Sequence, residues 1–239
     1  HIGAPKMNTK ENQSGTYRKT AIIVGVLFII GTVTGILSVI ISGPILEDPN
    51  YLLLIAENQN QLISGAICVL IMGLSLTMVP VMMFPILKKK NHALALGSVV
   101  FRGALEGVIY IAMVISWLLL IVLSQVYVEA GASDSSQYQV LGTILQESDD
   151  LMNIVLQIVF SIGALMFYTM FYQSKLIPRW LSLWGLIGGI PYFAWGILAL
   201  FGLDYGVLMV PLAVQEMVFA VWLIIKGFNS EAIAALSTK

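Results

Sequence analysis

Two charged residues that could do chemistry lie one helical turn apart inside an apolar part of the chain. Arg102 and Glu106 belong to the stretch Phe101-Arg102-Gly103-Ala104-Leu105-Glu106-Gly107. Residues four apart share one face of an α-helix, so the guanidinium and the carboxylate can meet. Charged groups inside a bilayer are costly unless they are paired, and by default they mark a functional site. This pair is therefore our first candidate site.

A third charged residue, Glu216, lies in a later apolar segment at a similar expected depth. We count depth from membrane boundaries near Leu94 and Ile225, at about 1.5 Å per residue. Arg102 then lies about 12 Å deep, Glu106 about 18 Å and Glu216 about 13 Å. All three fall near the middle of a hydrocarbon core about 30 Å thick. We therefore expect them to form one cluster if their helices are neighbours.

One arginine and two glutamates leave this cluster with an excess negative charge if all three ionise. We expect one glutamate to be protonated, or a cation to join the cluster. The expected roles are Glu216 as the titrating carboxylate, with Arg102 pairing an anionic group or Glu106. The side chains that could supply polar edges to a pocket are Tyr110, Trp117, Tyr192 and Gln215. An ion pair that only pins two helices together is an alternative.

The composition shows which kind of element must position these residues. The 239 residues are 58% hydrophobic and 10% charged, against about 25% charged in soluble domains. A membrane-spanning helix needs about 20 apolar residues. Six segments meet this requirement: 20–42, 60–87, 93–123, 151–173, 179–202 and 206–226. The fold class is therefore an all-α, polytopic membrane protein with six transmembrane helices, and no basic patch indicates nucleic-acid binding.

The loops between these segments differ in charge. All basic loop residues fall on one side: Lys10, Arg18, Lys19, Lys88, Lys89, Lys90, Lys175, Arg179, Lys226 and Lys239. The loops on the other side contain acidic residues and no lysine or arginine. Basic residues near helix ends face the cytoplasm, so both termini are expected to be cytoplasmic.

The two longer outer connections, Ser42–Gln59 and Ser124–Asp150, contain apolar residues of their own. We predict short interfacial helices there, over Tyr51–Ala56 and Gln137–Gln146.

The ends of the chain are expected to lie outside the helical domain. Residues 1–15 are expected to be a vector remnant, up to Lys6, followed by a disordered cytoplasmic segment. The six-helix domain then covers 16–229, and 230–239 form a cytoplasmic tail.

The sequence lacks the residues that several common kinds of functional site require. His92 is the only histidine apart from His1, so zinc and di-iron sites of the usual kind have no ligands, and no phosphate-binding loop is present. We expect no cofactor and no metal. The weak metal candidates are the carboxylates Glu147, Asp149 and Asp150, which more often act as a favourable start to a helix.

Pairs of glycines predict close helix contacts. Gly31 and Gly35, and Gly103 and Gly107, are each four residues apart, the spacing that lets helix backbones approach. Such faces could also join copies of the chain in an oligomer.

Four pieces of the sequence resemble an uncharacterised bacterial membrane family, domain of unknown function 4386. They are Arg18-Lys19-Thr20-Ala21, Phe101-Arg102 with Glu106, Leu176-Ile177-Pro178-Arg179-Trp180-Leu181, and Glu216 with Trp222-Leu-Ile-Ile-Lys226-Gly227. The resemblance spans about 16–229, and Asp150 stands where the family has an acidic position. It implies a six-helix protein of the bacterial inner membrane and no particular activity.

Three functions are compatible with these observations. The first is binding or translocation of a small molecule, a lipid or a proton by Arg102, Glu106 and Glu216. The second is an intramembrane enzyme with a glutamate as general acid and base on a lipid-like substrate. The sequence names no second catalytic group, which argues against catalysis. The third is a structural or partner-binding bundle in the lipid bilayer.

Overall fold

A computed structural model describes residues 8–132 and 135–237, and every regular element among them is a helix. The elements are α1 (Asn8–Leu46), α2 (Tyr51–Glu57), α3 (Gln59–Leu87), α4 (His92–Ser98), the π-helix η1 (Val99–Leu105), α5 (Glu106–Glu129), α6 (Ser135–Ser174), α7 (Arg179–Ala199), the 3-10 helix η2 (Gly206–Met209), α8 (Val210–Ile225) and α9 (Ser230–Ser237). Six spans in the described chain are long and apolar enough to cross a membrane: Gly15–Leu46, Gln59–Leu87, His92–Glu129, Ser136–Ser174, Arg179–Ala199 and Gly206–Ile225. The prediction of an all-α protein with six such helices is confirmed.

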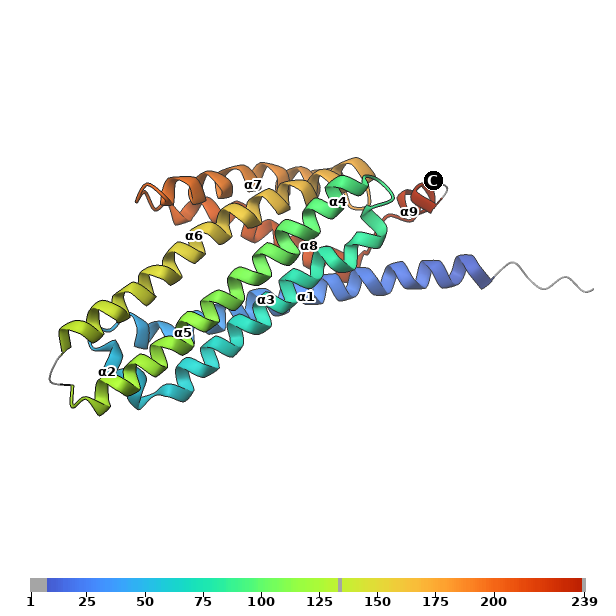
Figure 1. Ribbon diagram of the computed structural model, residues 1–239. Helices are drawn as coiled ribbons and strands as arrows, with labels where there is room; N and C mark the ends of the chain where they lie inside the picture. The colour runs from blue at the N-terminus through green and yellow to red at the C-terminus, as the bar shows by residue number, and fades with distance from the viewer. Residues whose placement is uncertain (1–7, 133–134, 238–239) are drawn as a thin grey trace, which may run out of the picture.

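The six spans form an elongated bundle in which the order around the bundle follows the order along the chain (Figure 1). Helix α1 packs on α3, α3 on α5, α5 on α6, α6 on α7, and α7 on α8. Contacts between α8 and α1 close the ring. The third and sixth spans are therefore not neighbours in the ring, and side chains that join them must reach across its interior.

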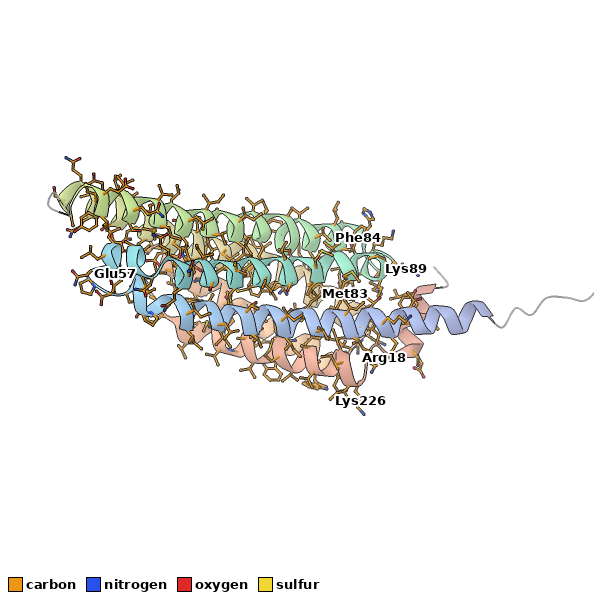
Figure 2. The ribbon with its side chains drawn as sticks, turned by 90° about the horizontal axis from the view of Figure 1, so that it is seen from below. Arg18, Glu57, Met83, Phe84, Lys89 and Lys226 are labelled. Atoms are coloured by element: carbon orange, nitrogen blue, oxygen red, sulfur yellow. The ribbon has the colours of Figure 1, made fainter. Side chains whose placement is uncertain are left out.

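Charge separates the two ends of the bundle (Figure 2). Arg18, Lys89 and Lys226 lie at one end, which we call the basic end, and Glu57 lies at the opposite, acidic end. The start of α1 and the C-terminal helix α9 both lie at the basic end (Figure 1). At this end, Lys89 of the α3–α4 connection donates a hydrogen bond of 3.0 Å from Nζ to Tyr17 Oη of α1.

At the basic end, Arg18 of α1 stabilises the contact between α1 and α8 through hydrogen bonds. Its guanidinium donates to the carbonyl oxygens of Leu223 and Ile224, at 3.1 and 2.6 Å. These carbonyls belong to the last turn of α8, where no intrahelical partner is left and a positive charge is favourable. Gly227 follows with φ +71°, and a Cβ there would lie 2.8 Å from Arg18 Nη1. The positive φ of the turn favours glycine at this position, and the close approach of Arg18 fits the absence of a Cβ.

The structure differs from the expected elements at two places. Helix α1 begins at Asn8, so the segment 8–15, which was expected to be disordered, is helical. Residues Gln137–Gln146 form no separate helix and lie in the first turns of α6, whereas a short helix, α2, covers Tyr51–Glu57 as expected. With 40 residues, α6 is about 60 Å long, twice the thickness of the hydrocarbon core, so part of it must extend beyond that layer. Residues 1–7 lie outside the described chain.

The predicted glycine contacts occur within the chain. A Cβ on Gly31 would lie 2.6 Å from Leu76 Cδ2, and one on Gly35 would lie 2.7 Å from Met72 Sδ, so this face of α1 lies tightly on α3. Gly107 faces Thr77 of α3 at 3.2 Å. These faces are therefore occupied by a neighbouring helix of the same chain.

Candidate functional site

The π-helix η1 presents Arg102 to the bundle interior. It lies between α4 and α5 and spans Val99–Leu105, so Arg102 is inside it and Glu106 directly follows it. Both side chains are completely buried, at 0% exposure, while Glu216 on α8 is 13% exposed. Single π turns inside α-helices occur frequently at functional sites. No feature of the residue spacing predicts this turn.

Arg102, Glu106 and Glu216 meet in the structure, and Arg102 pairs most closely with Glu216. The distance from Arg102 Nη1 to Glu216 Oε1 is 2.9 Å, whereas Arg102 Nε lies 3.9 Å from Glu106 Oε2. The pairing therefore joins the third and sixth spans across the ring. The i, i+4 pair between Arg102 and Glu106 that the sequence suggests is also present, and it is the longer of the two contacts.

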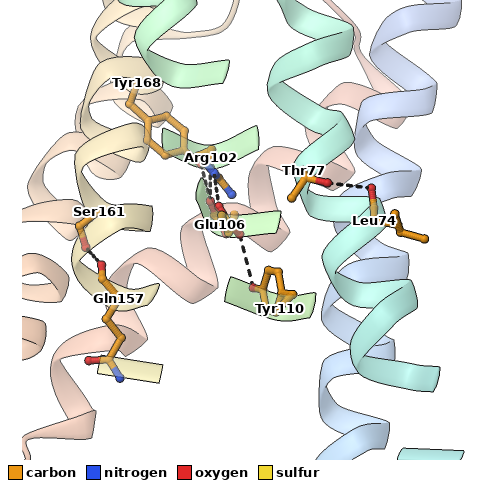
Figure 3. A network of polar contacts seen from close by, with 9 residues as sticks. Leu74, Thr77, Arg102, Glu106, Tyr110, Gln157, Ser161 and Tyr168 are labelled. Atoms are coloured by element: carbon orange, nitrogen blue, oxygen red, sulfur yellow. Dashed lines mark hydrogen bonds and ion pairs between the residues drawn. The ribbon is translucent and has the colours of Figure 1, made fainter. Parts of the chain in front are cut away.

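Two tyrosines complete the charged cluster, which we define as Arg102, Glu106, Glu216, Tyr110 and Tyr168 (Figure 3). Tyr168 Oη donates to Glu216 Oε1 at 3.3 Å, and Tyr110 Oη donates to Glu106 Oε1 at 3.4 Å. Three polar atoms in the cluster make no hydrogen bond to any residue that the structure describes. They are Arg102 Nε, Arg102 Nη2 and Glu106 Oε2. Glu106 is thus the carboxyl group with the weaker set of partners.

Aromatic rings enclose the guanidinium of Arg102. Its Cζ lies 4.6 Å from the ring centroid of Phe160, 5.4 Å from that of Phe28 and 5.7 Å from that of Phe167. A cation near ring faces is attracted by their quadrupoles, and the rings also exclude water. Arg102 is therefore stabilised by one close carboxylate and an aromatic shell contributed by α1 and α6.

Glycines on neighbouring helices make room for the cluster. A Cβ on Gly163 of α6 would lie 2.6 Å from Arg102 Cγ and 2.9 Å from Arg102 N. In the same way, a Cβ on Gly73 would lie 2.8 Å from the Tyr110 side chain, and one on Gly185 would lie 2.6 Å from the Tyr168 side chain. Sequence reasoning missed Gly163, Tyr168 and the three phenylalanines, because hydropathy does not show which face of an apolar helix points inward.

The predicted pocket residues occupy different places. Tyr110 belongs to the charged cluster. Gln215 is buried and donates from Nε2 to the carbonyl oxygen of Leu181, so it ties α8 to α7. Tyr192 packs on Phe160, with 5.0 Å between ring centroids. Trp117 is not in the cluster and instead lines a separate cavity toward the acidic end.

That cavity, which we call the acidic cavity, has a volume of about 600 Å³ and lies between α1, α3, α5 and α6. Its apolar lining comes from Val39, Leu46, Val69, Met72, Met113, Trp117 and Leu120. Its carboxylates are Glu47, Glu147, Asp149 and Asp150, and the described residues that line it include no lysine, arginine or histidine. Its remaining lining residues are Gly35, Ser38, Ser42, Gly43, Gln146 and Asn153. The cavity therefore combines an apolar wall with a strongly negative one.

Two lining side chains carry polar atoms without a partner. Asp149 Oδ1 and Ser42 Oγ are buried and make no hydrogen bond within the described chain. Asp149 Oδ2 accepts a long hydrogen bond, 3.5 Å, from Asn153 Nδ2. In the described part of the chain no group of three histidine, cysteine, aspartate or glutamate side chains is arranged so that it could hold a metal ion.

A row of polar residues runs along α6 from this cavity to the level of the charged cluster. Asp149, Asn153, Gln157 and Ser161 are each four residues apart and so follow one face of the helix. Ser161 Oγ donates to the carbonyl oxygen of Gln157 at 2.6 Å, and Gln157 Oε1 is buried without a partner among the described residues (Figure 3). This spacing is visible in the sequence and could have been found there.

The cavity and the charged cluster are close but separate. Met113, in the cavity wall, lies one turn from Tyr110, which hydrogen-bonds Glu106. Arg102, Glu106 and Glu216 are not among the lining residues of this cavity. The cluster can therefore influence a molecule in the cavity through charge and helix packing, and not by direct contact in this conformation.

The pieces of sequence that resemble a known family gather at two places in the structure. Arg102, Glu106 and Glu216 form the charged cluster, whereas Arg18 and Gly227 meet at the basic end. No curated protein and no solved structure that was compared matches the chain. The profile of the family described as Domain of unknown function (DUF4386) matches residues 23–227, which is most of the sequence. The chain therefore belongs to the DUF4386 family.

Proposed function

We propose that this protein binds a small organic cation in the acidic cavity and links that binding to a proton held on the charged cluster. The observation that carries the proposal is the lining of the cavity, where four carboxylates and no basic residue face an apolar wall. Its volume of about 600 Å³ is in the range of small-molecule sites, roughly 300–1,000 Å³. Trp117 in the wall offers a ring for cation–π contact. An amine or quaternary ammonium with an apolar body matches these features.

We further propose that the protein lies in the bacterial inner membrane with both ends of the chain in the cytoplasm. The support for this orientation is the gathering of lysine and arginine at one end of the bundle, since such residues face the cytoplasm. The acidic cavity then opens toward the outer side, where a cation would enter along the negative wall.

The charge balance of the cluster supports the link to a proton. One guanidinium and two carboxylates are neutral together only when a proton is added, and burial disfavours a net charge. We assign this proton to Glu106, whose Oε2 has no hydrogen-bond partner in the described chain. The sequence analysis assigns the titrating role to Glu216, but the 2.9 Å pair with Arg102 makes Glu216 the better stabilised carboxylate.

The distance between the acidic cavity and Glu106 sets how strongly a bound cation and the Glu106 proton affect each other. Met113 and Trp117 are seven and eleven residues beyond Glu106 on α5, or about 10 and 16 Å along the helix axis. Two unit charges at such distances interact by about 1 kcal/mol at an effective dielectric constant of about 20. A cation in the cavity should therefore favour loss of the Glu106 proton by about five-fold.

A pair of ions with the same shape and opposite charge tests the cation site. Tetraphenylphosphonium and tetraphenylborate can each be titrated into the purified protein by isothermal calorimetry. We expect saturable binding of the phosphonium and none of the borate, because the cavity wall is negative. Asp149→Asn should weaken phosphonium binding by about ten-fold, or about 1.4 kcal/mol. The matched control is Glu129→Gln, which removes an exposed carboxylate at the end of α5 outside the cavity lining. Equal binding of the two ions, or equal loss in the two variants, would contradict the proposal.

A further inference from the structure

A second cavity, at the basic end, carries the opposite charge. It has a volume of about 490 Å³ and is formed by the α6–α7 connection, the end of α8 and the residues that follow α8. Three cations line it, Lys175, Arg179 and Lys226, and no carboxylate is among its described lining residues. The other lining residues are Leu176, Ile177, Pro178, Trp222, Gly227, Phe228 and Asn229. We call it the basic cavity.

The three cations of the basic cavity lack acidic partners. The described chain has ion pairs only within the charged cluster, so none of the three is neutralised by a carboxylate. Glu231 is the nearest acidic residue along the chain and lines an adjoining cavity together with Lys90 and Lys175. Three like charges around one space repel each other and attract an anion.

The walls of the basic cavity are fixed by the backbone. Asn229 N donates to the carbonyl oxygen of Leu176 at 2.9 Å, which joins the segment after α8 to the α6–α7 connection. Lys175 has φ +57°, a conformation that redirects the chain directly after α6. The cavity is therefore a built feature of the fold, and not a gap between loose side chains.

An apolar groove continues from the basic cavity along α8. It has a volume of about 390 Å³ and is lined by Met217, Val218, Val221, Trp222, Ile225 and Lys226. Trp222 and Lys226 belong to both spaces, so they are contiguous. The groove follows α8 for nine residues, about 13 Å, and its residue Ile225 is 64% exposed. An anionic group and an apolar chain are thus accommodated side by side.

We infer that the basic cavity and this groove together bind one anionic phospholipid, with the phosphate among Lys175, Arg179 and Lys226 and an acyl chain along α8. The charge complementarity selects the headgroup, because clustered lysine and arginine at a membrane boundary attract anionic lipids. The groove selects a lipid over free phosphate, since only a lipid has a chain to fill it. Trp222 lies where the two parts meet, the usual position of tryptophan at the boundary between headgroups and hydrocarbon. This inference does not depend on the proposed cation site, which lies toward the other end of the bundle.

Native mass spectrometry of the full chain can test the lipid site with phosphatidylglycerol and phosphatidylcholine of identical acyl chains. We expect one phosphatidylglycerol to bind at least about ten-fold more tightly than phosphatidylcholine. The variant Lys175→Gln, Arg179→Gln, Lys226→Gln should lose this preference. Its matched control is Lys88→Gln, Lys89→Gln, Lys90→Gln, which removes the same charge at the same end of the bundle from residues that do not line the basic cavity.

Competition separates a lipid from its phosphate alone. Glycerol phosphate should displace phosphatidylglycerol weakly, because it cannot fill the groove, and Val221→Asn in the groove should weaken the lipid and leave glycerol phosphate unaffected. The lipid assignment is overturned if glycerol phosphate competes as well as the lipid does. It is also overturned if wild-type protein shows no preference for phosphatidylglycerol, or if both triple variants lose it equally. The comparison of two lipids on wild-type protein holds even if a variant does not fold.

Discussion

At the scale of single residues, the close pair between Arg102 and Glu216 makes the third and sixth spans depend on each other. Arg102 is completely buried, with aromatic rings on several sides, and Glu216 is mostly buried. Removing one member of a buried ion pair leaves the other without compensation, which typically costs about 3–5 kcal/mol. Loss of Glu216 should cost less stability than loss of Arg102, because Glu106 remains as a carboxylate near Arg102.

We therefore expect an order of stabilities among three variants. Arg102→Met leaves two buried carboxylates without a cation and should lower the free energy of unfolding by about 3 kcal/mol or more. Glu216→Gln keeps a side chain that can accept from Arg102 and should cost less. Glu106→Gln should cost least, since its contact with Arg102 is 3.9 Å. Thermal unfolding in detergent measures the order, with Glu129→Gln as the control. If Glu106→Gln proved the most destabilising, Glu106 and not Glu216 would be the main partner of Arg102.

A glycine substitution tests the close approach of α6 to Arg102. Gly163→Ala places a Cβ 2.6 Å from Arg102 Cγ and 2.9 Å from its backbone nitrogen, so the helices must separate. Overpacking of this kind costs about 1–3 kcal/mol. Gly15→Ala in α1 is the matched control, because a Cβ there meets nothing within 4 Å. It should leave stability unchanged or raise it by up to about 1 kcal/mol. Equal melting temperatures for the two variants would show that α6 does not press on Arg102.

At the scale of elements, the seam between α1 and α8 closes the ring through few polar contacts. Arg18 supplies these at the basic end, where it donates to carbonyl oxygens in the last turn of α8. We expect Arg18→Gln to raise hydrogen exchange of the amides in that last turn, because the carbonyls lose their charged donor. Lys19→Gln changes the neighbouring exposed lysine and should leave exchange in α8 as it is in wild type. Similar exchange in both variants would mean that Arg18 does not secure the seam.

The sequence predicts the spanning helices well and their internal geometry poorly. Length and hydropathy are sufficient for the spans, since each crosses a layer of fixed thickness. The π turn at Val99–Leu105 could not be predicted, because nothing in the sequence of this segment distinguishes a π turn from an α turn. The start of α6 was also missed, since residues 135–150 are too polar to read as part of a span although they continue the same helix.

For the candidate site, too, the sequence predicts the residues but not their arrangement. Arg102, Glu106 and Glu216 stand out in the sequence because charges are rare in apolar segments. Their arrangement depends on which helices face each other across the ring, and neither residue spacing nor hydropathy contains that information. Trp117 illustrates the difficulty, since it was expected beside the cluster and lies instead in the acidic cavity.

At the scale of the whole molecule, the cation site and the buried proton should be linked thermodynamically. If a cation in the cavity favours release of the Glu106 proton, then raising the pH must tighten cation binding. We expect tetraphenylphosphonium affinity to rise by about five-fold more in wild type than in Glu106→Gln as the pH increases across the titration of Glu106. Carboxylates of the cavity titrate in both proteins, so the difference between the two curves isolates Glu106. Calorimetry at several pH values measures it, and identical curves would remove Glu106 from the link.

The position of Glu216 late in the chain has a consequence for how the protein is made. Arg102 and Glu216 are separated by 114 residues, so the ribosome needs roughly 6–23 s to supply the second after the first. During that interval the acidic residue nearest to Arg102 on the same span is Glu106, four residues away, whereas Glu129 lies at the far end of that span. We expect Glu106→Gln to lower the yield of membrane-inserted protein, measured by glycosylation mapping of nascent chains, more than it lowers the stability of the finished bundle. The longer contact, between Arg102 and Glu106, would then stabilise the arginine during membrane insertion. Glu216 would become its main partner once the sixth span is inserted.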